Sequence, residues 1–212
     1  MTLLSKYQSE RHVSPTRGRH ALRMGVEANA RLTASTALVL LILLAVEGVT
    51  VLQIRPLVTM HVFVGMLLVP PVLVKLSSTL WRFAKYYLGS TDYRGKGPPP
   101  TMLRVLGPFV ALLTIVLFAS GILLLLGPAS LRSQFLLIHK ASFFLWFAFM
   151  TVHVLGHLGD TAKLATKDWT SRARLVVAGS RIRRYVLSAS LIVGLLLAFV
   201  TIPHVGPWLA GA

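Results

Sequence analysis

The sequence lacks cysteine altogether, and this absence excludes several kinds of site. A chain of 212 residues without cysteine has no disulfide framework, no thiolate metal site, no cysteine nucleophile and no thioether-bound cofactor. Acidic residues are scarce as well, with 6 Asp+Glu against 22 Lys+Arg and a net charge of +16. Charged residues of both signs make up only 13% of the chain, which is about half the share of an ordinary soluble domain.

The excess of basic residues lies in a strongly apolar chain. Hydrophobic residues make up 55% of the sequence, and the mean hydropathy is +0.71. A nucleic-acid-binding protein with a pI near 11.5 is usually polar and lysine-rich, and intrinsic disorder requires low hydrophobicity. Both classes are therefore excluded. We expect an integral membrane protein that has the lipid bilayer as its partner and binds no nucleic acid.

Five apolar runs are long enough to cross a bilayer as helices. Because they are continuous and do not alternate with polar residues, they favour helices over barrel strands. The expected fold class is all-α, with five transmembrane helices near residues 32–54, 57–80, 104–126, 133–158 and 185–208. The expected organisation is a basic arm, a bundle of four helices, a basic loop, and a fifth helix with a short tail, over residues 1–31, 32–158, 159–184 and 185–212.

The distribution of basic residues predicts how the helices are oriented. With the N-terminus in the cytoplasm, 19 of the 22 Lys+Arg residues fall on the cytoplasmic side, in the arm, in residues 75–104 and in residues 163–184. The outer side then holds only Arg55, Arg132 and Lys140. The positive-inside rule therefore predicts an N-in, C-out protein, and we expect it in a bacterial cytoplasmic membrane.

Histidines within the spans are candidates for a functional site, because ionisable groups inside a bilayer are costly. His139 and His153 are 14 residues apart on the fourth span, which is close to four helical turns, or roughly 21 Å, so both leave nearly the same face. His61 lies on the second span at the depth of His139, counted from the outer side. Two histidines at matched depth on different helices suit the two axial positions of one haem iron, because imidazole is a good ligand for that metal.

Glycines occur at the same depth as these histidines. Gly107 and Gly121 are also 14 residues apart on the third span, Gly48 lies on the first span near the level of His61, and Gly65 lies one turn beyond His61. A porphyrin between helices requires close approach of the backbone, which small residues allow. The alternative is that these glycines simply pack membrane helices together.

At these positions the chain resembles the cytochrome b superfamily, the four-helix haem bundles of bc-type complexes and bacterial di-haem membrane cytochromes. That family carries His–x13–His on the second and fourth helices and Gly–x13–Gly on the first and third. His139 with His153 and Gly107 with Gly121 match the pattern, and the resemblance covers approximately residues 32–158. It implies a four-helix haem b bundle plus one extra helix.

The inner layer of the pattern departs from the family at Lys75, which stands 14 residues after His61 where a histidine is expected. In one reading only the outer haem binds, and Lys75 extends to the headgroups. In a second, a neutral Lys75 ligates an inner haem opposite His153, and in a third an inner haem is five-coordinate on His153. We favour the first reading, with one haem b and a second as the alternative.

Two charged residues near the outer layer have candidate roles. Glu47 is the only carboxylate within a span, and a buried carboxylate must be neutralised or paired. It is either a proton acceptor for quinol oxidation or one half of an ion pair with Arg55 or Lys140. Arg55 lies at the level where haem propionates are expected, and its position predicts contact with them.

The expected function follows from the cofactor, because the sequence has no phosphate-binding loop and no nucleophile motif. The resemblance implies a b-type cytochrome membrane subunit that carries electrons between membrane quinone and an extracytoplasmic or membrane redox partner. Such a chain is an electron-transfer subunit of an oxidoreductase complex and not a stand-alone enzyme. The alternative is a haem-free scaffold or accessory subunit of a larger membrane complex.

Overall fold

A computed structural model describes residues 15–95, 97, 101–168, 177 and 179–209, with side chains described from residue 25 onward. Over these residues the secondary structure is helical, and five helices are long and apolar enough to cross a membrane. The prediction of an all-α protein with five helices able to span a membrane is therefore confirmed. The long helices are α2 (Pro15–Leu52), α3 (Ile54–Tyr87), α5 (Thr101–Leu126), α6 (Arg132–Ala165) and α8 (Ser180–Thr201).

Short elements and tight junctions connect the long helices. They are α4 (Thr91–Gly95), η2 (Ala129–Leu131), η3 (Thr166–Asp168), η4 (Ile202–Val205) and α9 (Gly206–Leu209). A single residue, Gln53, separates α2 from α3, and Pro128 is extended between α5 and η2. Helix α3 continues through Pro70 and Pro71, and its one departure from helical backbone angles is at Leu57, with φ −111° and ψ 16°.

The long helices extend beyond the apolar runs that predicted them. Helix α2 begins at Pro15, so residues 15–31 of the expected arm continue the first helix, while residues 1–14 lie outside the described part of the chain. Helix α6 likewise continues to Ala165, into the expected basic loop. Apolar content marks only the stretch able to lie in hydrocarbon, whereas helical hydrogen bonding continues into polar flanking sequence.

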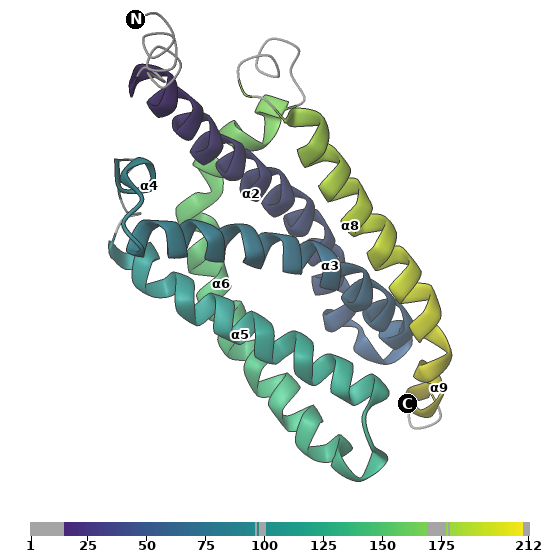
Figure 1. Ribbon diagram of the computed structural model, residues 1–212. Helices are drawn as coiled ribbons and strands as arrows, with labels where there is room; N and C mark the ends of the chain where they lie inside the picture. Colours follow the sequence, from purple (N-terminus) through teal and green to yellow (C-terminus); the bar gives the residue numbers. More distant parts are fainter. Residues whose placement is uncertain (1–14, 96, 98–100, 169–176, 178, 210–212) are drawn as a thin grey trace, which may run out of the picture.

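The helices form a bundle in which α2 packs along both α3 and α6, α5 packs along α6, and α8 covers the other side of α3 (Figure 1). Helices α3 and α5 make few contacts with each other. The junction of α2 and α3, the junction of α5 and α6, and α9 lie at one end of the bundle, called here the α9 end. The start of α2, α4 and the end of α6 lie at the opposite, α4 end (Figure 1).

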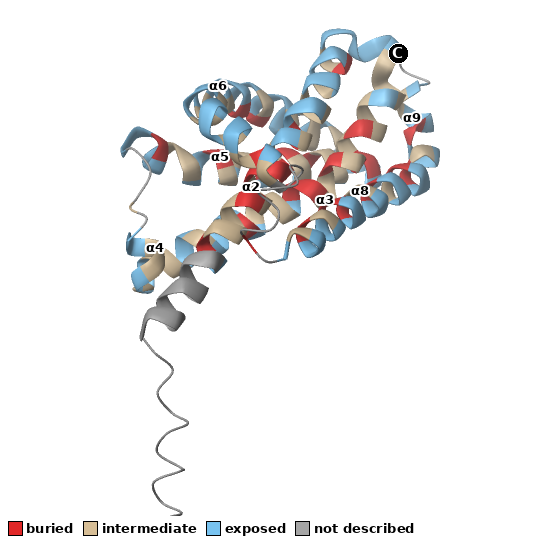
Figure 2. Cartoon of the chain, turned by 90° about the horizontal axis from the view of Figure 1, so that it is seen from above, coloured by how far each residue is buried: buried red, intermediate tan, exposed pale blue. Residues whose placement is uncertain are grey.

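Burial follows the helix interfaces. Buried positions face the centre of the bundle, and large apolar side chains such as Leu196, Phe199 and Val200 are exposed on the outside (Figure 2). An outer surface of this kind is suited to lipid and not to water. Helix α8 approaches the backbone of α3 closely at Gly194, which lies against the carbonyl group of Leu67.

Candidate functional site

An apolar cavity of about 620 Å³ lies inside the bundle toward the α9 end, within the range of about 300–1,000 Å³ that is usual for ligand and cofactor sites. Residues of α2, α3, α5, α6 and α9 line it. The lining is almost entirely apolar, and its ionisable members are Glu47, His61, His139 and Lys140. A cavity of this character suits a large, flat, mainly apolar group that a few polar contacts hold in place.

His61 enters the cavity from α3 and is held by residues of α2. Its Nδ1 lies 2.9 Å from Oε1 of Glu47 and 3.1 Å from the hydroxyl of Thr50. An ionised carboxylate only accepts hydrogen bonds, so Nδ1 of His61 keeps its proton and donates a hydrogen bond to Glu47. The proton on Nδ1 leaves Nε2 with a free lone pair, which is the state of a histidine that binds a metal.

His139 enters from α6 and is held by residues of α5. Its Nδ1 lies 3.1 Å from the backbone oxygen of Leu117 and 3.2 Å from the hydroxyl of Ser120. Because a carbonyl oxygen only accepts, Nδ1 of His139 is also the protonated nitrogen. Both histidines therefore carry their proton on the outward nitrogen and keep Nε2 available for a ligand.

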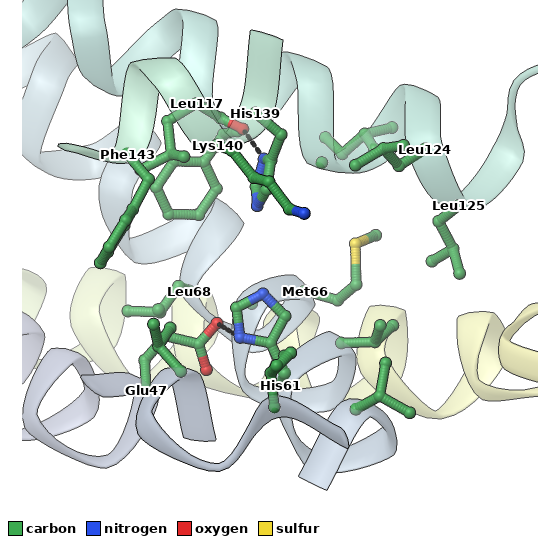
Figure 3. A pocket seen from close by; sticks show the side chains of 18 of the residues that line it. Glu47, His61, Met66, Leu68, Leu117, Leu124, Leu125, His139, Lys140 and Phe143 are labelled. Carbon is green, nitrogen blue, oxygen red and sulfur yellow. Dashed lines mark hydrogen bonds and ion pairs between the residues drawn. The ribbon is translucent and has the colours of Figure 1, made fainter. Parts of the chain in front are cut away.

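The two imidazoles face each other across the cavity. Their ring centroids are 6.3 Å apart and their planes are inclined by 79°, and Figure 3 shows the second nitrogen of each ring on the side that faces the other ring. Two imidazoles bound to opposite sides of one metal ion, with metal–nitrogen bonds of about 2 Å, place their centroids about 6 Å apart. The observed separation fits such a pair.

The described residues contain no cluster of three or more His, Cys, Asp or Glu side chains placed to hold a metal ion. A site built from protein side chains alone, such as structural zinc, takes four ligands. A haem iron requires only axial ligands from the protein. The pair His61 and His139 beside an apolar cavity therefore fits a haem better than it fits a free metal ion.

The predicted glycines fall into two groups. Gly65 and Gly121 line the cavity. A Cβ atom on Gly121 would lie 3.1 Å from Cε1 of His139, and one on Gly65 would lie 3.5 Å from Oε1 of Glu47. Gly48 is exposed and does not line the cavity, and a Cβ there would meet no atom within 4 Å.

Three further predicted site residues, Arg55, Lys75 and His153, do not line the cavity. Arg55 is exposed on α3 and is not among the lining residues, and Glu47 pairs with His61 instead of Arg55 or Lys140. His153 lies four turns along α6 from His139, and its Nδ1 is buried with no hydrogen-bond partner among the described residues.

Lys75 takes part in a polar contact between α2 and α3 near the α4 end. Its Nζ donates to the backbone oxygen of Thr33 at 3.1 Å, while the Thr33 hydroxyl donates to that of Ser78 at 2.9 Å. The side chain of Asn29 donates to the backbone oxygen of Ser78 at 3.1 Å. Nζ of Lys75 is thus hydrogen-bonded to the backbone of α2.

Several residues whose roles the sequence pattern does not indicate also belong to the site. Thr50 and Ser120 contact the Nδ1 atoms of the two histidines, and Trp208 of α9 lines the cavity. The guanidinium group of Arg132 also lies over Trp208, with its Cζ atom 5.6 Å from the centroid of the Trp208 ring. The place of Thr50 one helical turn after Glu47 is the one signal in the sequence that could have indicated its role.

Comparison of the chain with protein-family models, with curated proteins and with solved structures gives no match.

Proposed function

We propose that this chain is a b-type cytochrome subunit of a membrane oxidoreductase, with one haem b held between His61 and His139. It would carry electrons between membrane quinone and a redox partner in the membrane or beyond its outer face. When bound, the haem supplies one-electron chemistry through its iron. The observation that carries the proposal is the pair of imidazoles that face each other across an apolar cavity, each with Nδ1 bound to an acceptor.

The residues of the chain have separate tasks in this proposal. Glu47 and the Leu117 carbonyl fix the tautomer and orientation of the two ligands through their Nδ1 atoms. The apolar wall excludes water and lowers the local dielectric constant. Lys140 lines the cavity and Arg55 does not, so Lys140 is better placed to meet the negative charge of haem carboxylates.

The second ligand pair of a di-haem bundle is less well supported. Nζ of Lys75 is hydrogen-bonded to the carbonyl of Thr33, and no hydrogen bond joins it to His153 within the described residues. One haem near the α9 end is therefore the stoichiometry that we propose. Electrons would then enter and leave on the same side of the membrane.

We also propose an N-in, C-out orientation in a bacterial cytoplasmic membrane, with the α9 end outside. The support is the concentration of Lys and Arg in segments that reach the α4 end. In this orientation the His61–His139 pair lies near the outer face, where an extracytoplasmic partner can reach it.

Purification in detergent, followed by spectroscopy and a haem count, tests the proposal. We expect a low-spin b-type spectrum and one haem per chain. His61→Ala and His139→Ala each remove an axial ligand, so both should abolish that spectrum. Lys75→Met and His204→Ala are matched controls at a half-buried polar position and an exposed histidine, and both should keep the full haem content.

Two outcomes would contradict the proposal. A colourless but monodisperse and helical preparation would favour the haem-free scaffold. A count of two haems per chain, with one lost in Lys75→Met, would assign Lys75 as a ligand and overturn the single-haem stoichiometry.

A further inference from the structure

The two cavity histidines differ in the charge of the group that holds them. Nδ1 of His61 donates to a carboxylate, Glu47, at 2.9 Å. Nδ1 of His139 faces only neutral oxygens, the Leu117 carbonyl at 3.1 Å and the Ser120 hydroxyl at 3.2 Å. Hydrogen bonds to ionised groups are roughly twice as strong as those between neutral groups. The two imidazoles are therefore unequal as electron donors.

Glu47 is held in the position that this contact requires. The hydroxyl of Thr50 donates to the Glu47 backbone oxygen at 2.6 Å and lies 3.3 Å from Oε2 of its side chain. Thr50 is itself almost fully buried, at 2% exposed. The glycine at position 65 leaves room beside Oε1. The contacts of Thr50 with Glu47, and the space left by Gly65, thus orient the Glu47 carboxylate toward His61.

The carboxylate of Glu47 has no lysine or arginine partner among the described residues. Its close contact is with the neutral imidazole of His61, and neither Arg55 nor Lys140 forms a salt bridge with it. The cavity around it is almost wholly apolar, so the charge is weakly screened. Its electrostatic effect is therefore concentrated on the imidazole and on whatever that imidazole binds.

We propose that Glu47 is a positioning residue that makes His61 the stronger axial ligand and thereby lowers the reduction potential of the bound haem. This inference rests on the proposed function. A carboxylate that attracts the Nδ1 proton raises electron density at Nε2 and so raises the basicity of the ligand. A more basic ligand and a nearby negative charge both favour the ferric over the ferrous iron.

Redox titration of the purified holoprotein, followed by haem absorbance, tests this inference. Glu47→Gln keeps an oxygen that can accept the hydrogen bond from Nδ1 of His61, and it removes only the charge. We expect it to shift the ratio of ferrous to ferric haem at least tenfold toward ferrous, which for one electron is a rise in potential of about 59 mV. Ser120→Ala removes a neutral contact from the equivalent atom of His139 and is the matched control, with a smaller shift expected.

The outcomes separate this inference from the proposed function. Haem absent from the wild-type protein would defeat the proposed function. Haem present in both forms with equal potentials would overturn the inference alone and leave the proposed function standing. If Glu47→Gln does not fold, Glu47→Asp serves instead, because its shorter side chain lengthens the contact. We expect a smaller rise in potential there, and an unchanged potential in Glu47→Asp would then overturn the inference.

Discussion

The imidazole of His139 lies directly against Gly121, and this contact explains why a residue without a side chain belongs to the site. A Cβ at position 121 would lie 3.1 Å from Cε1 and 3.4 Å from Nδ1 of that ring. The ring is also tied to the carbonyl of Leu117, so it cannot move away without weakening its hydrogen bond. At the scale of the residue, the glycine and the carbonyl together determine the orientation of the His139 ring and so the direction of its Nε2.

Substitution of Gly121 by Ala should therefore weaken haem retention. We expect an affinity loss of about tenfold, the lower end of the range for a disturbed contact behind a metal ligand. The matched control is Gly48→Ala, because a Cβ at Gly48 meets nothing within 4 Å. Haem content per chain after dilution into haem-free buffer is the measurement. Equal retention in the two variants would contradict the expected role of Gly121.

Position along the sequence could indicate Gly121 but could not distinguish it from Gly48. Both occur near the depth of the histidines, as the spacing predicts, yet only Gly121 faces the cavity. The rotation of each helix about its own axis decides which side of it is inside, and that rotation depends on packing against other helices. The same limit applies to Glu47, whose partner is His61 although Arg55 and Lys140 were the candidates suggested by charge.

At the scale of the elements, α8 is attached to α3 by close packing of backbones. Gly194 of α8 lies against the carbonyl group of Leu67, and a Cβ there would be 3.1 Å from the Leu67 carbonyl carbon. The neighbouring core joins Met66 of α3, Leu125 of α5 and Ala198 of α8. Small residues permit this approach, as is usual where helices pack in a bilayer.

Replacement of Gly194 by Ala should force α8 away from α3. Since the obstacle is backbone and not a flexible side chain, we expect a destabilisation of about 1–3 kcal/mol, the usual cost of overpacking. Gly107→Ala, on the open face of α5, is the control and should be neutral or slightly stabilising. Thermal unfolding midpoints in the same detergent compare them, and equal midpoints would show that α8 is not packed against α3 at this point.

Helix α8 also places the final turn of the protein at the cavity. Through η4 it leads to α9, whose Trp208 lines the cavity and lies against Arg132. The fifth helix stands outside the expected four-helix bundle, and nothing in its spacing indicated a part in the site. Its contribution arises because α8 and the junction of α5 with α6 reach the same end of the molecule (Figure 1).

At the scale of the whole molecule, the absence of cysteine makes the orientation directly measurable. Ser90→Cys lies at the α4 end and Ala129→Cys at the α9 end, and each would be the only thiol in the chain. In spheroplasts, whose cytoplasmic membrane is intact, a membrane-impermeant thiol reagent should label Ala129→Cys alone. Both variants should be labelled after membrane disruption. Labelling of Ser90→Cys alone in intact spheroplasts would reverse the proposed orientation.

The helical class, the five apolar segments and the matched level of His61 and His139 could all be predicted from the order of residues alone. These properties depend on hydrophobicity and spacing, which add up locally along the chain. Four other features became evident only in the folded chain: Glu47 holds His61, Gly48 faces outward, Lys75 binds the backbone of α2, and Trp208 reaches the cavity. Those outcomes depend on helix rotation and on contacts between segments distant in sequence, because a side chain's partner is set by the packing of whole helices.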